Sequence, residues 1–338
     1  MRNFKVGITR DFMKPDGSSD LDNIVKPLFH DAGLEWEYIP ENTSELIGEQ
    51  IKEYDALLVL GAAITSHTFV NVNKLSIIAR FGVGYDKVDV EACTENGVLL
   101  TIAPDGVRRP VATSILTFVL SLSHQLLIKD RLTRAGLWEE KQDYMGMGLM
   151  GRTLGLVGMG NIGKETFKLA KPFGMNHITY DPFVNPNEAA EVNAELVDLE
   201  TLMSTADFIC VCCPLTDDTR GLINEKYLNM MKPTAYLINT ARGPIVDQKA
   251  LTDVLVNRRI QGAGLDVFEF EPIDDDDPLL ALDNVIVTPH SICWTDECFE
   301  GNGKSACQSI INAASGELPQ WIVNREVIDS PKLKMKLR

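Results

Sequence analysis

Residues Leu154–Gly163, which read LGLVGMGNIG, are the strongest indication of the fold in this chain. Apolar residues run directly into Gly158, and the glycines at 158, 160 and 163 follow the spacing G-x-G-x-x-G. Alone this spacing is a weak signal, because glycine is a common residue. Here it stands between a predicted strand and a predicted helix, which is the context that the spacing requires. The stretch therefore predicts a strand, a tight turn and a helix whose first N–H groups can bind a phosphate group.

A second apolar strand, Ile178–Tyr180, follows the helix and ends in Asp181, roughly 20 residues after the last glycine. A carboxylate at this place accepts a hydrogen bond from the 2′-OH of a ribose and repels a 2′-phosphate. Pro182 and Phe183 supply no arginine that would offset this repulsion. We therefore expect NAD, in preference to NADP, as the cofactor. The expected cofactor site contains Gly158, Gly160, Asn161, Ile162, Gly163 and Asp181.

Strands and helices alternate along most of the chain, first up to about Pro104 and again from Leu154 onward. The predicted strands are Val6–Thr9, Glu35–Ile39, Ala56–Leu60, Leu75–Ala79 and Val98–Ile102, then Leu154–Val157, Ile178–Tyr180, Phe208–Cys212, Ala235–Asn239, Gly264–Val267 and Val285–Thr288. The predicted helices include Asp22–Ala32, Ser44–Tyr54, one long helix with apolar positions from Ala112 to Leu127, and Glu297–Ala314. We interpret residues 136–151 as an extended connection. The alternation predicts an α/β protein with two doubly wound parallel sheets.

Composition narrows the possible partners and cofactors. The 338 residues carry a formal charge of −16, which argues against a nucleic-acid or anionic-membrane partner. The seven cysteines show no zinc-binding spacing, so we expect no metal and interpret them as core residues in a reducing, cytoplasmic compartment. The run Asp274–Asp277 lacks the spaced ligands of a calcium loop and is interpreted as a solvated acidic loop.

Ionisable residues follow three of the later predicted strands, at the sheet edge where ligands of parallel sheets bind. Arg242 follows the strand that ends at Asn239, and His290 follows the strand that ends at Thr288. Two glutamates, Glu269 and Glu271, follow the strand between them. Because the carboxyl ends of parallel strands meet at one edge, we expect one arginine, one glutamate and one histidine to lie together.

This set of side chains suits the oxidation of a 2-hydroxy acid. His290 can take the hydroxyl proton, because the ordinary pKa of histidine lies near neutral pH. Glu271 fits the role of a carboxylate that favours the imidazolium, and Arg242 can bind the substrate carboxylate and polarise the carbonyl oxygen. Taken singly, each residue has a structural explanation, and the remaining histidines receive that interpretation, namely His30, His67, His124 and His177.

Taken together and in order, these motifs resemble the D-2-hydroxyacid dehydrogenase family, the group of phosphoglycerate dehydrogenases and glycerate/hydroxypyruvate reductases. The resemblance covers nearly the whole chain from about Ala79 onward, and the preceding residues more loosely. The stretches that carry it are Ala79–Asp86 (ARFGVGYD), Leu154–Gly163, Cys213–Thr216 with Thr219, Asn239–Gly243 (NTARG), Gly264–Phe268 (GLDVF) with Glu271-Pro272, and Thr288–His290.

The resemblance implies a Rossmann NAD domain, residues 106–295, inserted into a flavodoxin-like substrate domain of residues 1–105 and 296–338. It implies that backbone amides around Val83 and Gly84 bind the substrate carboxylate together with Arg242. It also implies a homodimer with the long helix after Pro104 and the following loop at its interface. The further NAD contacts that it implies are Cys213, Pro214, Thr219, Thr240, Ala241 and, towards the carboxamide, Asp266.

Some positions depart from the family pattern and leave alternatives open. Asn161 stands where the family often has arginine, and Trp294 replaces a small residue, so that we expect a narrower pocket. Arg108 and Arg109 fit equally a second polar end of the substrate and a solvated helix start. The alternative function is a non-catalytic NAD(H)-sensing scaffold, like the corepressors that share this fold. Turnover of 2-keto acids distinguishes the two functions, whereas the substrate's own side chain stays open.

Overall fold

The computed structural model describes residues 4–337, which divide into two compact units. Unit 1 contains the residues up to Val107 and those from Thr295 onward, and unit 2 contains Arg108–Trp294. The helix α4 (Pro104–Ser123) crosses the division, because its first turn belongs to unit 1 and the rest to unit 2. Each unit has its own sheet and its own hydrophobic clusters, so the two are described separately.

Unit 1 is built on a five-stranded sheet in which each strand is parallel to its neighbours. The order β2-β1-β4-β6-β7 is that of a flavodoxin-like sheet, since two short strands, β3 (Glu45–Leu46) and β5 (Ala63–Ile64), pair only with each other. The five strands are β1 (Lys5–Ile8), β2 (Glu35–Tyr38), β4 (Ala56–Val59), β6 (Ile77–Arg80) and β7 (Leu99–Thr101).

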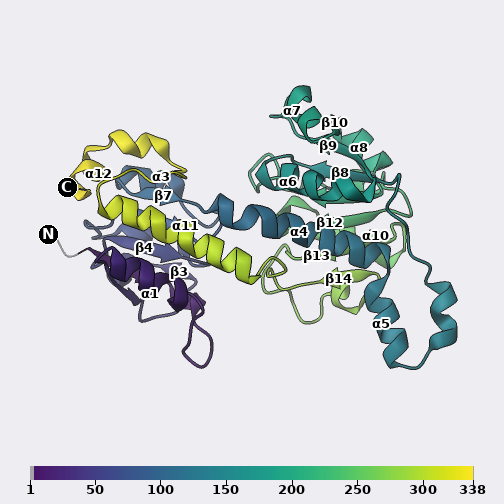
Figure 1. Cartoon of the computed structure of the whole chain (residues 1–338), viewed down its shortest axis with the longest axis horizontal. Helices are drawn as coiled ribbons and strands as arrows, with labels where there is room; N and C mark the ends of the chain where they lie inside the picture. Colours follow the sequence, from purple (N-terminus) through teal and green to yellow (C-terminus); the bar gives the residue numbers. More distant parts are fainter. Residues whose placement is uncertain (1–3, 338) are drawn as a thin grey trace. The chain divides into compact units, whose positions relative to one another are not determined.

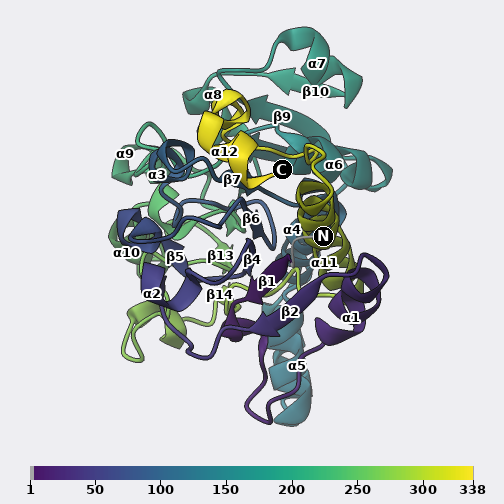
Figure 2. The same ribbon diagram turned by 90° about the vertical axis from the view of Figure 1, so that its left-hand side faces the viewer.

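Helices cover both faces of the unit 1 sheet. Alternate residues of a strand point to opposite faces, so Leu58 packs with α1 (Asp22–Asp31) and α11 (Asp296–Ala314), whereas Leu57 packs with α2 (Gly48–Ile51) and α3 (Val90–Glu95). Figure 2 shows the two pairs of helices on opposite sides of the strands. The last helix, α12 (Pro331–Lys336), adds the buried Leu333 to the α1 side. Near-continuous apolar strands are what burial on both faces requires.

Unit 2 is built on a seven-stranded parallel sheet in the order β10-β9-β8-β11-β12-β13-β14, the doubly wound order of a dinucleotide-binding fold. Its strands are β8 (Thr153–Val157), β9 (Asn176–Tyr180), β10 (Ala194–Leu196), β11 (Phe208–Val211), β12 (Tyr236–Asn239), β13 (Gly262–Leu265) and β14 (Val285–Val287). The predicted α/β fold with two parallel sheets is confirmed.

Two hydrophobic clusters lie on the two faces of this sheet. On one face Leu202 and Val254 come from α8 (Leu199–Thr205) and α10 (Gln248–Val256). On the other face Phe118 and Phe167 come from α4 and α6 (Asn161–Ala170). Two further short helices are α7 (Pro186–Glu191) and α9 (Glu225–Leu228). Phe118 lies against β13 so closely that a Cβ on Gly264 would stand 2.7 Å from its ring, which explains the glycine there.

Several boundaries differ from those predicted. The long helix ends at Ser123 and α5 (Leu126–Arg134) follows, because Gln125 adopts the left-handed backbone conformation at φ 52°. Residues 44–54 form β3 and α2 rather than one helix, and a 3-10 helix, Trp138–Asp143, interrupts the predicted extended connection. The strand predicted as 264–267 is 262–265, and the edge strand β10 was missed because three residues give too short a pattern.

Figure 1 shows α5 standing away from the sheet of unit 2. Within residues 4–337 no single helix is long and apolar enough to span a membrane. Only α4 and α5 taken together reach that length and apolar character, and the two helices are bent by 55° at their junction.

Candidate active site

The glycine-rich turn lies between β8 and α6 with the geometry that its glycines permit. Gly158 has a φ of 98°, which favours glycine, and a Cβ there would stand 2.7 Å from the backbone nitrogen of Cys213. A Cβ on Gly163 would stand 2.8 Å from the carbonyl oxygen of Gly158, so the start of α6 packs directly against the turn. Gly160 is different, because apart from its chain neighbours no atom of residues 4–337 lies within 4 Å of the place where its Cβ would be.

This open space suits the pyrophosphate of a dinucleotide. Gly160 is the N-cap of α6, and no side chain caps the helix, so the N–H groups of its first turn, from Asn161 and Ile162 onward, are available to an anion. The dipole of α6 adds a favourable potential at the same place. The open space at Gly160, the uncapped amides of α6 and the nearby carboxylate of Asp181 therefore fit NAD.

Asp181 directly follows β9 and contacts the glycine-rich turn. One carboxylate oxygen, Oδ2, accepts a hydrogen bond from the N–H of Met159 at 2.8 Å, and the other accepts one from the N–H of Phe183 at 2.9 Å. Each carboxylate oxygen can accept more than one hydrogen bond, so a ribose hydroxyl can still bind. The contact with Met159 gives Asp181 a second role, which is to hold the glycine-rich turn.

The other predicted NAD contacts lie on turns after β11 and β12. The Thr219 hydroxyl donates to the carbonyl of Pro214 at 2.7 Å and closes the turn that begins at Cys213. Burial raises the pKa of the Cys213 thiol to about 11, which favours a packing role rather than a reactive one. The turn of Thr240 and Ala241 is held by the buried Asn239, whose side chain accepts from the Ala241 N–H and donates to the Arg242 carbonyl.

Two residues at the ends of β13 and β14 make the central contact of the site. His290 Nδ1 and Glu271 Oε2 are 2.8 Å apart, and Glu271 Oε1 accepts a hydrogen bond from the N–H of Phe268 at 3.1 Å. Their side chains are 43% and 33% exposed, so the pair is supported by protein and still reachable from solvent. Burial raises the pKa of Glu271, but the hydrogen bond and charge of His290, the Phe268 N–H and the charge of Arg242 together lower it below its usual range. Glu271 is therefore ionised at neutral pH.

Arg242 follows β12, the neighbour of β13 in the sheet. Its Nη1 donates to the carbonyl of Ala241 at 2.8 Å, and its charge contributes to lowering the pKa of Glu271. The structure thus brings the predicted arginine, glutamate and histidine to one edge of the unit 2 sheet, with Glu271 rather than Glu269 against the imidazole.

Asp266, which directly follows β13, holds the segment that carries His290. Its Oδ1 accepts hydrogen bonds from the Thr288 hydroxyl at 2.6 Å and from the N–H groups of Ser291 and Ile292 at 2.9 and 3.1 Å. Burial raises the pKa of Asp266, although these hydrogen bonds and the charge of His290 act in the opposite direction. These hydrogen bonds of Asp266 could not be predicted from the sequence, because no spacing rule links a strand end with a turn so far along the chain.

Val83 and Gly84 belong to unit 1, in the loop after β6. Neither N–H, nor that of Tyr85, has an acceptor among residues 4–337, so three consecutive amides are available to an anion. Arg109, which we considered for a substrate role, pairs with Glu165 at 2.8 Å. Trp294 is 55% exposed, two residues beyond the segment that Asp266 holds.

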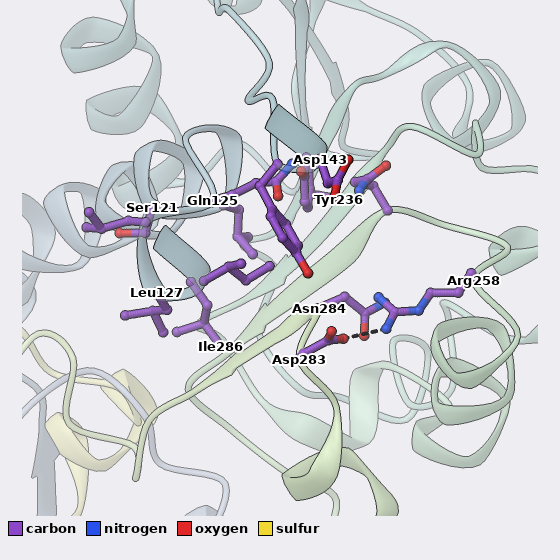
Figure 3. A pocket seen from close by; sticks show the side chains of 14 residues that line it. Ser121, Gln125, Leu127, Asp143, Tyr236, Arg258, Asp283, Asn284 and Ile286 are labelled. Carbon is purple, nitrogen blue, oxygen red and sulfur yellow. Dashed lines mark hydrogen bonds and ion pairs between the residues drawn. The ribbon is translucent and has the colours of Figure 1, made fainter. Parts of the chain in front are cut away.

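A cavity of about 180 Å³ lies elsewhere in unit 2 (Figure 3). Its walls include Gln125 from the junction of α4 and α5, Tyr236 at the start of β12 and Asn284 just before β14. These are the amino ends of the strands, so the cavity lies at the edge of the sheet opposite to His290. Among the described residues no group of three or more histidine, cysteine or acidic side chains could hold a metal ion.

Comparison with known proteins identifies relatives along most of the chain. Residues 116–291 match the model of the D-isomer specific 2-hydroxyacid dehydrogenase NAD-binding domain. The chain is 39% identical over 289 residues to a glyoxylate reductase of Thermococcus litoralis, covering 83% of this chain and 87% of that one.

A second relative, a D-3-phosphoglycerate dehydrogenase of Methanocaldococcus jannaschii, is 40% identical over 293 residues, which are 86% of this chain but 56% of that protein. Among solved structures, a D-lactate dehydrogenase of Aquifex aeolicus, complexed with NAD and lactic acid, is similar with a TM-score of 0.82 and 27% identity. That alignment covers 94% of this chain and 99% of the other.

Proposed function

The chain belongs to the D-isomer-specific 2-hydroxyacid dehydrogenase family and is an NAD-dependent enzyme of that kind; on this premise we propose that it interconverts a small D-2-hydroxy acid and its 2-keto acid with His290 as the acid and base. The observation that carries the proposal is the 2.8 Å contact between His290 and Glu271 at the sheet edge. The name of the Thermococcus litoralis relative makes glyoxylate the first substrate to test.

His290 moves the proton at its Nε2 atom. Nδ1 is engaged by Glu271, so Nε2 is the nitrogen that faces the substrate hydroxyl in oxidation and returns the proton in reduction. The ionised Glu271 stabilises the imidazolium by charge and fixes the plane of the ring. Asp266 fixes the main chain on both sides of His290 through Thr288 and Ser291. When bound, the nicotinamide accepts the hydride in oxidation and supplies it in reduction.

Arg242 binds the substrate carboxylate and polarises the oxygen on C2. Its planar guanidinium can donate two parallel hydrogen bonds to a carboxylate, and developing negative charge on the oxygen is stabilised by the same cation. We assign the N–H groups of Val83 and Gly84 to the substrate carboxylate as well, since both lack an acceptor within residues 4–337.

The cofactor is assigned to the glycine-rich turn and to Asp181. Gly158, Gly160, Asn161, Ile162 and Gly163 would receive the pyrophosphate, and Asp181 the adenosine ribose. The remaining parts of NAD would lie beside the carboxylate of Asp266 and beside two turns, which contain Cys213, Pro214, Thr219, Thr240 and Ala241. The carboxylate of Asp181 would disfavour NADP, because a 2′-phosphate would meet a negative charge there.

The test is a substrate panel. Purified protein is mixed with NADH and glyoxylate, hydroxypyruvate or pyruvate, and the loss of NADH absorbance is followed. We expect turnover of at least one 2-keto acid, and the product is analysed on a chiral column for the D-enantiomer where one exists. Tight NADH binding without turnover of any 2-keto acid would support the scaffold function instead.

We also propose that the enzyme is a cytoplasmic homodimer. On α5 and the segment after it, Leu126, Trp138 and Met145 are 54%, 62% and 86% exposed, which is unusual for large apolar side chains on one segment. A second copy that covers them explains this exposure. Within residues 4–337, Cys93, Cys210, Cys212, Cys213 and Cys307 form no disulfide bond, which suits a reducing compartment. Light scattering of the protein and of Leu126→Glu tests the dimer, because the variant should be monomeric.

A further inference from the structure

Arg80, the last residue of β6, donates hydrogen bonds to three main-chain carbonyls of unit 1. Its Nε donates to the carbonyl of Gly84 at 2.9 Å, and its Nη1 donates to the carbonyl of Val59 at 3.0 Å and to that of Leu60. The guanidinium therefore joins the end of β4 to the loop after β6. Arg80 lies in the stretch Ala79–Asp86 that carries the family resemblance, but its sequence position alone indicates no role.

The contact with Gly84 sets the direction of the next amide. A trans peptide is planar, so its C=O and N–H groups point in opposite directions. Since the Gly84 carbonyl points to Arg80, the N–H of Tyr85 points away from the guanidinium. This N–H and those of Val83 and Gly84 have no acceptor within residues 4–337. Successive amides of this kind form a concave site for an anion.

The charge of Arg80 strengthens the same amides. A hydrogen bond from a cation to a carbonyl polarises the peptide group, so the Tyr85 N–H becomes a better donor than an ordinary amide.

We propose that Arg80 is a positioning residue for the substrate carboxylate, which acts through the Gly84–Tyr85 peptide and makes the Tyr85 N–H a third donor beside those of Val83 and Gly84. This inference rests on the proposed function, because it takes the substrate to be a 2-keto or 2-hydroxy acid. The fork of the guanidinium is essential to the role, since it reaches carbonyls of two separate segments, and an ammonium lacks that geometry.

The experiment compares Arg80→Lys and Arg80→Gln with the unmodified enzyme. The Michaelis constant and kcat are measured for the 2-keto acid that the enzyme reduces best, together with the inhibition constant of oxamate, a carboxylate that is not reduced. We expect both variants to raise the Michaelis constant and the oxamate constant about 10- to 100-fold, the factor for losing one hydrogen bond to a charged group. The turnover number and the NADH dissociation constant, measured by fluorescence, should change little.

Two controls separate positioning from folding. Arg325→Ala removes an exposed arginine of the same unit and should leave all constants unchanged. Arg80→Ala removes the guanidinium and leaves space for a soluble one, so millimolar guanidinium should restore substrate affinity to this variant and not to Arg80→Gln.

The inference is overturned if the Lys and Gln variants keep the ordinary Michaelis constant. It is also overturned if Arg80→Ala loses thermal stability and kcat together and guanidinium restores neither, since the residue would then only support the fold. Failure of the unmodified protein to reduce any 2-keto acid refutes the proposed function instead, so the two failures are distinguishable.

Discussion

The strands of the two parallel sheets are followed by different kinds of chemical group. The carboxyl edge of the unit 2 sheet carries Arg242, Glu271 and His290, whereas the loop after β6 in unit 1 offers main-chain N–H groups and directs Arg80 onto carbonyls. A reaction that moves a proton needs a titratable group, but a carboxylate can be held by fixed dipoles alone. Under the proposed function, the same architecture therefore serves catalysis in one unit and binding in the other, according to the few residues that follow its strands.

The largest expected effect is at the imidazole of unit 2. His290→Asn removes the group that exchanges the proton, so kcat should fall about 10²- to 10⁴-fold, the usual contribution of general acid–base catalysis. The NADH dissociation constant should stay near its ordinary value, since NADH contacts are expected elsewhere. Stopped-flow turnover and NADH fluorescence measure the two quantities. Glu271→Gln keeps a hydrogen-bonding oxygen, so its kcat should fall less than that of His290→Asn. A fully active His290→Asn enzyme would refute the proposed role of His290.

A pair of core substitutions tests whether the two units differ in function rather than in stability alone. Phe118→Ala in unit 2 and Phe29→Ala in unit 1 each remove a fully buried ring, at a cost of about 3–5 kcal/mol. Phe118 lies under β13, whose end carries the site, so its loss should also weaken NADH binding. The unit 1 variant should bind NADH normally. Calorimetry and NADH titration measure this, and an equal loss of NADH affinity in both would contradict it.

The next effect concerns the cofactor turn. Asp181→Ala should raise the NAD dissociation constant about 10- to 100-fold, because it removes a charged acceptor for a ribose hydroxyl and also the brace on Met159. Asp181→Asn keeps an oxygen for the brace and removes the negative charge, so it should bind NADP better relative to NAD. Isothermal titration with both cofactors decides this. Equal use of NAD and NADP by the unmodified enzyme would refute the assignment.

The smallest expected effect concerns the stability of unit 2, which should depend on pH through His177. Burial lowers the pKa of His177, and a backbone contact only partly offsets it. The native state then binds fewer protons than the unfolded state below about pH 6.5, so stability rises with pH through this range and is lost on acidification. Thermal unfolding between pH 5 and about pH 8 should show a shallower slope for His177→Gln. An unchanged slope would show that other groups dominate.

The parts of the site that could be predicted are those that follow from strand ends. Gly158–Gly163, Asp181, Arg242 and His290 lie directly after strands whose apolar patterns are clear, so topology alone brought them to one edge. The bonds of Asn239 and Asp266 to neighbouring turns could not be predicted in this way. They depend on the direction of single side chains, which neither spacing nor periodicity contains.

The α/β architecture, the glycine-rich turn and the sheet edge that bears the ionisable residues could all be predicted from the amino-acid sequence, because apolar periodicity, glycine spacing and chain order are local properties. Three features needed the folded chain: Asp266 accepts hydrogen bonds from the turn after His290, the long helix breaks at Gln125, and the guanidinium of Arg80 donates to carbonyls. These outcomes depend on distances between residues far apart in the chain, which packing of the whole unit sets.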